Sequence, residues 1–435
     1  MIKTRNARIN PLSFAISAVL LLVGTISAVA QSSSPEKNPT KRRNSSEEPA
    51  YAGLTLYNHE QLALARAKAQ AGTAPYAVAV DTLRKKANQL LTMEPPSVMQ
   101  KKMMPPSGDK HDYYSLGIYW WPNPDTNDGL PYVRNDGVKN PEYENFDGPA
   151  IRRMADAVFP LSLAWFYTAD EAYAQKAAEL LATWFLNPAT RMNPHLEYGQ
   201  SIPGITEGRG IGIIETGALV EVVNGIELLR DSNALSKADY QGLREWLAAY
   251  TDWLISSKNG WDERRYHNNH GSSYDSQVAT FALFAGEDSV ATMILDSVKV
   301  KRIDRQIKAD GSQPWELSRT KAMSYSIKNL RHLIENAIIA EDEGIDLWHY
   351  QSPEGSSIYR GLAYLVPFYT EEKEFPYQQL GGLDDQADNL LELLWIAAPK
   401  YEDRAIGTWI DNFPVSVADH SLLHLTYPRV TTENN

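Results

Sequence analysis

Apolar residues recur at helical spacing over most of the chain, and this pattern predicts a mainly α-helical protein. Segments such as Pro149–Thr168 and Lys237–Ser257 place apolar side chains on one face and polar side chains on the other. Ser236 precedes the second of these segments and is a plausible N-cap for it. The other predicted helices are Glu60–Gln70, Tyr76–Leu91, Glu171–Leu186, Glu215–Asp231, Tyr274–Phe284, Ser289–Lys308, Tyr325–Asp342, Ser356–Phe368 and Gln386–Ala397.

The predicted helices come mostly in pairs joined by short turns, which is typical of helical hairpins packed side by side. Such pairs either stack into an open solenoid or close into an α/α toroid. No repeat of fixed length is visible, which disfavours a regular solenoid. We therefore predict an all-α protein with an α/α toroid, an incomplete α/α barrel of paired antiparallel helices with long aromatic loops at one end.

The first residues have the features of an export signal. A basic start is followed by an apolar run that ends in small residues, as signal peptidase requires. Ser and Gly interrupt the run, which is short for a membrane span; a retained anchor is the alternative. Residues 31–50 are polar and rich in Pro and Ser, as in a disordered linker. We predict a signal peptide at 1–30, a linker at 31–50 and one toroid domain at 51–435, exported to the periplasm or secreted, with no membrane contact after signal removal.

The charge distribution argues against a nucleic-acid partner. The formal net charge is -12, and binding to nucleic acid without sequence preference needs a surplus of basic residues. Residues 258–331 differ, because they carry 12 Lys and Arg against 9 Asp and Glu, a local net charge of +3. A locally basic region in an acidic protein can receive an anionic ligand. The alternative is a solvated helix face.

A long non-helical segment, Gly108–Gly137, is rich in tyrosine and tryptophan. Loops of this length are uncommon in a domain and usually functional. We predict that Tyr113, Tyr114, Trp120 and Trp121 contact a sugar; the alternative is a packed aromatic strap over one end of the barrel. The "DTNDG" stretch in this segment has its glycine one position too early for a calcium-binding EF-hand loop, so no metal is predicted there.

The stretch "HNNH", His267 to His270, is the first candidate for chemistry. Its spacing, without a glutamate or third ligand nearby, is not the pattern of a zinc protease. A buried histidine and asparagine that satisfy each other are one explanation. The other is catalysis, since an imidazole moves protons near neutral pH and an amide can bind a carboxylate.

The second candidate is "DGSQPWELSRTKAMSYS", in which Arg319 and Tyr325 lie six residues apart. We expect them to straddle a loop and the start of a helix. Arginine offers a planar fork to a carboxylate, and a tyrosine beside cations has a lowered pKa. Taken alone, Arg319 is also explained by a surface ion pair with Glu316.

Together, His, Asn, Arg and Tyr are the groups needed to eliminate across C4 and C5 of a uronic acid. The C5 proton becomes acidic once the adjacent carboxylate loses its charge by hydrogen bonding to Asn, His or Arg. A tyrosinate or an imidazole then takes this proton, and a tyrosine hydroxyl protonates the leaving O4. This chemistry needs no cofactor and no metal, and we predict none.

These motifs resemble the alginate lyase family of helical-toroid polysaccharide lyases. The resemblance rests on "NNHG" (268–271), "DGSQPWELSR" (310–319), the following Tyr325, and the aromatic "HDYYSLGIYWWPNP" (111–124). The spacing from His270 to Arg319 to Tyr325 is most similar to polysaccharide lyase family 38, which includes lyases of alginate and of glucuronan. The related family 5 usually places its tyrosine one residue further from the arginine.

The resemblance implies a lyase that acts on an anionic polysaccharide, alginate or else glucuronan. It implies that Asn269, His270, Arg319 and Tyr325 form the active site. Asn269 and Arg319 would neutralise the carboxylate, and Tyr325 would protonate O4. His270 would be the base where the C5 proton and O4 lie on opposite faces of the ring. Further substrate contacts are expected from three basic residues near the motifs, Arg264, Arg265 and Lys321.

Two other functions stay open at this point. A glycoside hydrolase on the same toroid needs two carboxyl groups across the scissile bond. Asp262, Glu263 and Glu316 are available for that role, but the sequence forces no pair. A non-catalytic glycan-binding protein would need only the aromatic loop.

Overall fold

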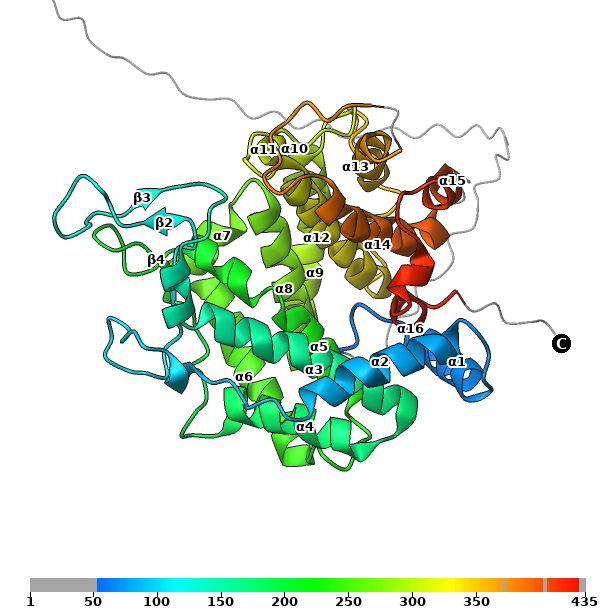
Figure 1. The fold of residues 1–435 in the computed structure, drawn as a ribbon, viewed down its shortest axis with the longest axis horizontal. Coiled ribbons are helices and arrows are strands. Elements are labelled where there is room, and N and C mark those ends of the chain that lie inside the picture. Colours follow the sequence, from blue (N-terminus) through cyan, green and yellow to red (C-terminus); the bar gives the residue numbers. More distant parts are fainter. Residues whose placement is uncertain (1–52, 371–372, 402–404, 430–435) are drawn as a thin grey trace, which may run out of the picture. The chain divides into compact units, whose positions relative to one another are not determined.

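The computed structural model describes residues 53–370, 373–401 and 405–429, and these are mainly helical (Figure 1). The predicted signal peptide and linker lie outside the described residues. The first helices are α1 (His59–Gln70), α2 (Tyr76–Leu90), α3 (Gly148–Thr168), α4 (Glu171–Leu181), α5 (Leu219–Leu228), α6 (Lys237–Ser256), α7 (Lys258–Arg264) and α8 (Asn269–Ala285). The later ones are α9 (Asp288–Val298), α10 (Asp304–Gln306), α11 (Pro314–Leu317), α12 (Ala322–Asp342), α13 (Ile358–Leu365), α14 (Ala387–Ala397), α15 (Ala405–Asp411) and α16 (Leu423–Thr426).

The predicted helices miss α7 and α15 altogether, and α8 begins at Asn269 and not at Tyr274. The side chain of Asn268 caps this helix, since its Oδ1 accepts a hydrogen bond from the backbone N–H of His270 at 3.2 Å. Apolar periodicity could not reveal this first turn because its residues are polar. The predicted cap at Ser236 is confirmed, since its hydroxyl oxygen accepts from the N–H of Asp239.

Helix α8 forms the centre of the fold, and it is buried from Gly271 to Phe284. It packs against α6, α9 and α12, while α3 packs against α2, α4 and α5, so neighbouring helices pair as an α/α toroid requires (Figure 1). The polar side chains of α8 each have a buried partner; for example, Ser272 donates to Asn329 of α12. Among the described residues, no helix is long and apolar enough to cross a membrane.

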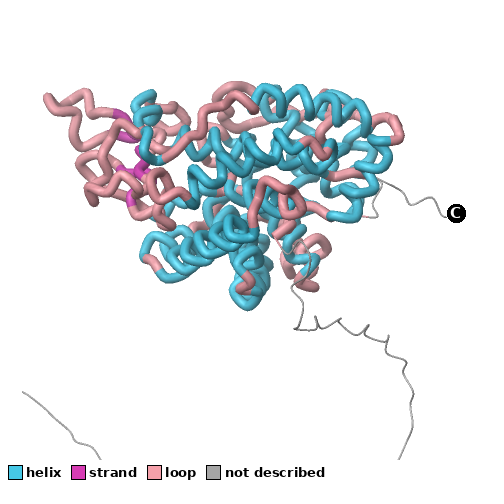
Figure 2. Tube along the Cα trace, turned by 90° about the horizontal axis from the view of Figure 1, so that it is seen from below, coloured by secondary structure: helices cyan, strands magenta, loops and turns pink. Residues whose placement is uncertain are grey.

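In the part of the chain that the structure describes, four short strands lie with the long loops at one end of the helices (Figure 2). The sequence did not predict them. Strand β1 (Tyr114–Leu116) runs parallel to β4 (Tyr198–Ser201), and β2 (Trp120–Trp121) pairs antiparallel with β3 (Val133–Arg134). Three of these strands belong to the aromatic segment. The segment is therefore held in place by backbone pairing.

The corner between α7 and α8 is held by Arg302, whose side chain is 3% exposed. Its guanidinium forms a bidentate ion pair with Asp275 of α8, at 2.6 and 3.0 Å. It also donates to the backbone carbonyls of Arg264 and Tyr266. A Cβ at Gly271 would lie 2.3 Å from both the guanidinium and the Tyr266 carbonyl, so this close approach requires glycine.

Replacing Arg302 by methionine should strongly destabilise the protein. The change leaves Asp275, whose side chain is 1% exposed, without its counter-charge, and such losses typically cost about 3–5 kcal/mol. The matched control is Arg84→Met, which breaks an exposed pair with Asp81 and should cost about 1 kcal/mol or less. Urea denaturation followed by tryptophan fluorescence compares the two. Equal losses of free energy of unfolding would contradict the role of Arg302.

Candidate active site

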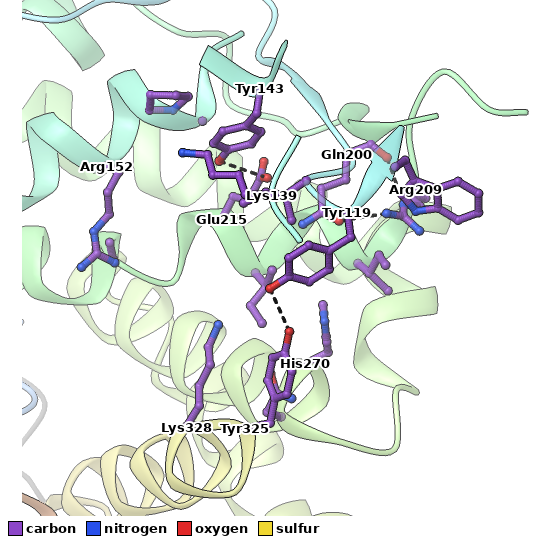
Figure 3. Close-up of a pocket in the computed structure, with 18 of the residues that line it drawn as sticks. Tyr119, Lys139, Tyr143, Arg152, Gln200, Arg209, Glu215, His270, Tyr325 and Lys328 are labelled. Atoms are coloured by element: carbon purple, nitrogen blue, oxygen red, sulfur yellow. Dashed lines mark hydrogen bonds between the residues drawn. The ribbon is translucent and has the colours of Figure 1, made fainter. Parts of the chain in front are cut away.

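A cavity of about 700 Å³ opens where α8 and α12 begin (Figure 3). It is lined by the aromatic segment, the start of α3, residues 200–218, the α7–α8 corner and the first turns of α12. Two carboxylates line it, Glu144 and Glu215. The basic residues outnumber them, and these are Arg134, Lys139, Arg152, Arg153, Arg209, Arg319 and Lys328. An acidic protein thus has a basic cavity, which suits a polyanionic ligand.

His270 lies in the first turn of α8 and lines the cavity. Its Nδ1 lies 2.8 Å from Oε1 of Glu263, whose side chain is fully buried. A carboxylate can only accept here, so Nδ1 carries a proton, and Nε2 is the nitrogen that faces away from Glu263 and can exchange a proton with a ligand. The buried Glu263 therefore orients the imidazole.

Asn269 is held by the second buried carboxylate, Glu316. Its backbone N–H donates to Oε1 of Glu316 at 2.6 Å, and its Nδ2 donates to both carboxylate oxygens at 3.0 and 2.9 Å. Burial raises the pKa of Glu316, although the hydrogen bonds from Asn269 act in the opposite direction. The amide oxygen of Asn269 has no hydrogen-bond partner among the described residues. The surface pair of Arg319 with Glu316, considered from the sequence, does not form.

Arg319 pairs instead with Asp136, from the loop after β3, at 2.8 Å. Its guanidinium also donates to the hydroxyl of Tyr325 at 3.2 Å and lies 4.2 Å from the centre of that ring. The Tyr325 hydroxyl lies 2.9 Å from that of Tyr119, as the dashed line in Figure 3 marks. Arg319 and Tyr325 straddle a loop and a helix start, as predicted, since α12 begins at Ala322.

The protonation of Tyr325 differs from the expectation. Burial and the neighbouring Tyr119 raise the pKa of Tyr325 well above its ordinary value, and Arg319 only partly opposes them. The lowered pKa was predicted from the nearby Arg319 alone, because the burial of Tyr325 is not visible in the sequence. The tyrosine is therefore a neutral hydroxyl in the free protein, ready to donate a proton.

Of the four aromatic residues predicted to contact a sugar, Trp120 lines the cavity. Tyr113 is fully buried and its hydroxyl donates to Glu215, so it supports the wall from behind. Tyr114 and Trp121 lie outside the lining. Trp120 and Trp121 differ because they are successive residues of β2, and successive side chains of a strand point to opposite faces.

The three basic residues predicted near the motifs do not line the cavity. Arg264 and Arg265 lie over the exposed ring of Trp261, at 5.6 and 5.8 Å from its centre. The backbone of Lys321 forms an isolated antiparallel β-bridge with Gln379, just before α12. The lysine of this region that does line the cavity is Lys328, one turn beyond Tyr325.

Sequence reasoning missed several lining residues, notably Tyr119, Gln200, Arg209 and Lys328. Tyr119 lies in the aromatic segment that the sequence marked as functional. Its contact with Tyr325 could not be predicted from the sequence. Gln200 and Arg209 belong to stretches without a distinctive motif, where Arg209 donates to the side chain of Gln200. The structure brings them to the cavity through the pairing of β4 with β1.

Residues 97–375 match the family model described as alginate lyase. The chain belongs to the alginate lyase family. It is therefore a polysaccharide lyase by family, as the sequence predicted. The sequence matches none of the curated proteins with which it was compared.

Solved structures of alginate lyases have the same fold. An alginate lyase from Bacteroides ovatus shares 39% identity and a TM-score of 0.83, over 86% of this chain and 99% of that one. Alginate lyase A1-III from Sphingomonas species A1 shares 17% identity and a TM-score of 0.55, over 84% of this chain and 92% of that one. A histidine-to-alanine variant of A1-III was solved with a tetrasaccharide. It shares 16% identity and a TM-score of 0.55, over 86% of this chain and 93% of that one. The predicted α/α toroid is thereby confirmed.

The wall behind the cavity contains a buried acid, Glu215. It accepts hydrogen bonds from Tyr113 at 2.8 Å and Ser115 at 2.5 Å, and a longer one from Tyr143 at 3.4 Å. Burial raises its pKa to about 7, although these hydroxyl groups act in the opposite direction. Glu215 thus ties the aromatic segment to the residues before α5. No three His, Cys, Asp or Glu side chains in the described ranges are grouped to hold a metal ion.

The raised pKa of Glu215 predicts a pH-dependent contribution to stability. Between about pH 4.5 and 7 the folded protein keeps a proton that the unfolded chain has lost, so this contribution falls as the pH rises. Glu215→Gln removes the titrating group and so should remove this pH dependence. From pH 4.5 to pH 8, the unfolding free energy of the variant relative to wild type should therefore rise by up to about 3 kcal/mol. Urea denaturation at pH 4.5 and pH 8 measures it. A difference that does not change with pH would contradict this prediction.

Proposed function

We propose that this protein cleaves a polyuronate, with alginate as the first candidate, by β-elimination that leaves a C4–C5 double bond. The observation that carries the proposal is the Tyr325 hydroxyl, which meets the Arg319 guanidinium in the cavity that Asn269 and His270 also line. The basic lining of that cavity supports an anionic chain as substrate. The Bacteroides ovatus relative is described as an alginate lyase.

In the proposed reaction, the carboxylate of the reacting uronate lies between Arg319 and Asn269. Hydrogen bonds from these groups withdraw its negative charge and so make the C5 proton more acidic. The guanidinium already has one acidic partner in Asp136, which keeps its fork oriented while its outer N–H groups reach the substrate. Asn269 contributes an N–H of its amide, which Glu316 holds in place.

The proton transfers follow from the two neutral groups at the cavity. Where the C5 proton and O4 lie on the same face of the ring, as in mannuronate, Tyr325 acts as both the base and the acid. Its oxygen takes the C5 proton while its own hydroxyl proton passes to O4, so the tyrosine ends neutral as it began. Where they lie on opposite faces, as in guluronate, Nε2 of His270 takes the C5 proton and Tyr325 protonates O4.

The finer assignment within the family is also a proposal. The six-residue spacing from Arg319 to Tyr325 favours polysaccharide lyase family 38 over family 5. Glucuronan is the second candidate substrate, because the same groups act on any 4-linked uronate. A panel of alginate blocks and glucuronan, assayed side by side, separates the two.

The positions of Glu263 and Glu316 weigh against these two acids as the carboxyl pair of a glycoside hydrolase. Glu263 is bound to His270, and Glu316 is bound to Asn269. Both are buried and neither lines the cavity. An acid and a base that flank a glycosidic bond must reach it from the cavity surface.

We also propose that the protein is exported, as a single catalytic domain that follows a signal peptide at 1–30 and a linker at 31–50. The basic and apolar start of the sequence supports this proposal. N-terminal sequencing of the mature protein from a periplasmic fraction tests it. A mature chain that begins at residue 1 would contradict it.

Tyr325→Phe should nearly abolish turnover on every polyuronate. The change removes one hydroxyl and keeps the ring, so packing stays the same while O4 loses its proton donor. General acids and bases contribute about 10²–10⁴-fold in rate. The ultraviolet absorbance of the unsaturated product measures the loss, and Tyr350→Phe, outside the cavity, is the matched control. Wild-type protein that releases saturated sugars, or a Tyr325 variant with more than about a tenth of wild-type turnover, would contradict the proposal.

A further inference from the structure

Lys328 is a cavity residue for which the elimination chemistry has no use. It lies on α12 three residues after Tyr325, which is about 4.5 Å further along the helix axis. Figure 3 shows its side chain rising from α12 beside Tyr325. The separation is of the order of one pyranose ring. With a reacting uronate at Tyr325, the next sugar of the chain would lie beside Lys328.

The other basic residues of the cavity are already paired or fully solvated. Arg134 and Arg319 share Asp136, and Lys139 pairs with Glu144. The remaining partners are Asp156 for Arg152 and Gln200 for Arg209, while Arg153 is exposed. Among the described residues, Lys328 has no ion pair and no hydrogen bond, although it is only partly exposed.

The carboxylates nearest to Lys328 are occupied by other groups. Glu316 accepts from Asn269, Glu263 from His270, and Glu335 pairs with His332. Burial lowers the pKa of the Lys328 ammonium, and the guanidinium of Arg152 adds to this, while Glu316 and Glu263 oppose it. A desolvated cation without a partner costs stability. An anionic ligand would recover that cost on binding.

We propose that the Lys328 ammonium binds the carboxylate of the uronate adjacent to the reacting one. The site then selects chains in which uronates follow each other directly. A polysaccharide that alternates uronates with neutral sugars would leave the lysine desolvated and unpaired, which discriminates against it. This inference rests on the proposed function, since it names the substrate class of the same site.

The test compares Lys328→Met and Lys328→Arg with wild type on oligouronates of defined length. Lys328→Met should lower kcat/KM about 10–100-fold, mainly through a higher KM, which is the effect of losing one charge-assisted hydrogen bond. Lys328→Arg should restore most of the loss, because the charge returns. Lys86→Met, which removes an exposed lysine on α2, should change nothing.

Two further readouts separate ligand binding from a structural role. The thermal midpoint of Lys328→Met should equal or exceed that of wild type, because a desolvated charge is removed. The pH profile of kcat should stay unchanged, because Lys328 does not act on Tyr325. A lower midpoint or a shifted profile would overturn the inference, and so would an unchanged KM.

Substrate chemistry provides the complementary test. An oligouronate with a methyl ester on the sugar next to the scissile bond, on the side that Lys328 contacts, should be as poor for wild type as the free acid is for Lys328→Met. The losses of kcat/KM caused by the ester and by Lys328→Met should then not add when the two are combined. Additive losses for esters on either side would overturn the inference.

Failure of the proposed function is distinguishable from failure of this inference. Wild-type protein that forms no unsaturated product from any polyuronate would refute the proposed function alone. Calorimetric titration of a saturated tetrauronate then tests Lys328 by itself. Equal affinity for wild type and Lys328→Met would overturn the inference.

Discussion

The site depends on how the chain turns from α7 into α8. Arg302 binds Asp275 on α8 and the backbone carbonyls of Arg264 and Tyr266, and Gly271 leaves room for this approach. Because the pair is buried, the corner has one arrangement, and Asn269 and His270 begin α8 at a fixed place. Helix α12 packs along α8 and brings Tyr325 to the same cavity.

Acidic groups under the site and basic groups around it have separate tasks. Two carboxylates that the substrate cannot reach, Glu263 and Glu316, orient the imidazole and the amide. The cations lie at the cavity surface, where they attract a polyanion and reduce the charge of its carboxylates. This division explains how a protein with a net charge of -12 can bind an acidic polysaccharide.

The sequence predicted most of the long helices, the toroid and the four residues that meet at the cavity, because periodicity and family motifs are local signals. It did not predict the partners of those residues. Tyr119 reaches Tyr325 across 206 positions, and Asp136 reaches Arg319 across 183, through loops that have no period. The pKa of Tyr325 was predicted in the wrong direction for the same reason, since burial follows from packing and not from neighbours in sequence.

The central claim is that the glycosidic bond is broken by elimination and not by water. Cleavage of alginate in oxygen-18 water, quenched early with borohydride to prevent exchange at the new reducing end, tests it by mass spectrometry. Elimination breaks the bond from C4 to the bridging oxygen, so this oxygen stays on C1 of the product that gains the new reducing end. The other product carries the C4–C5 double bond, and neither product should contain the label. One labelled oxygen for each bond cleaved, with two saturated products, would contradict the account.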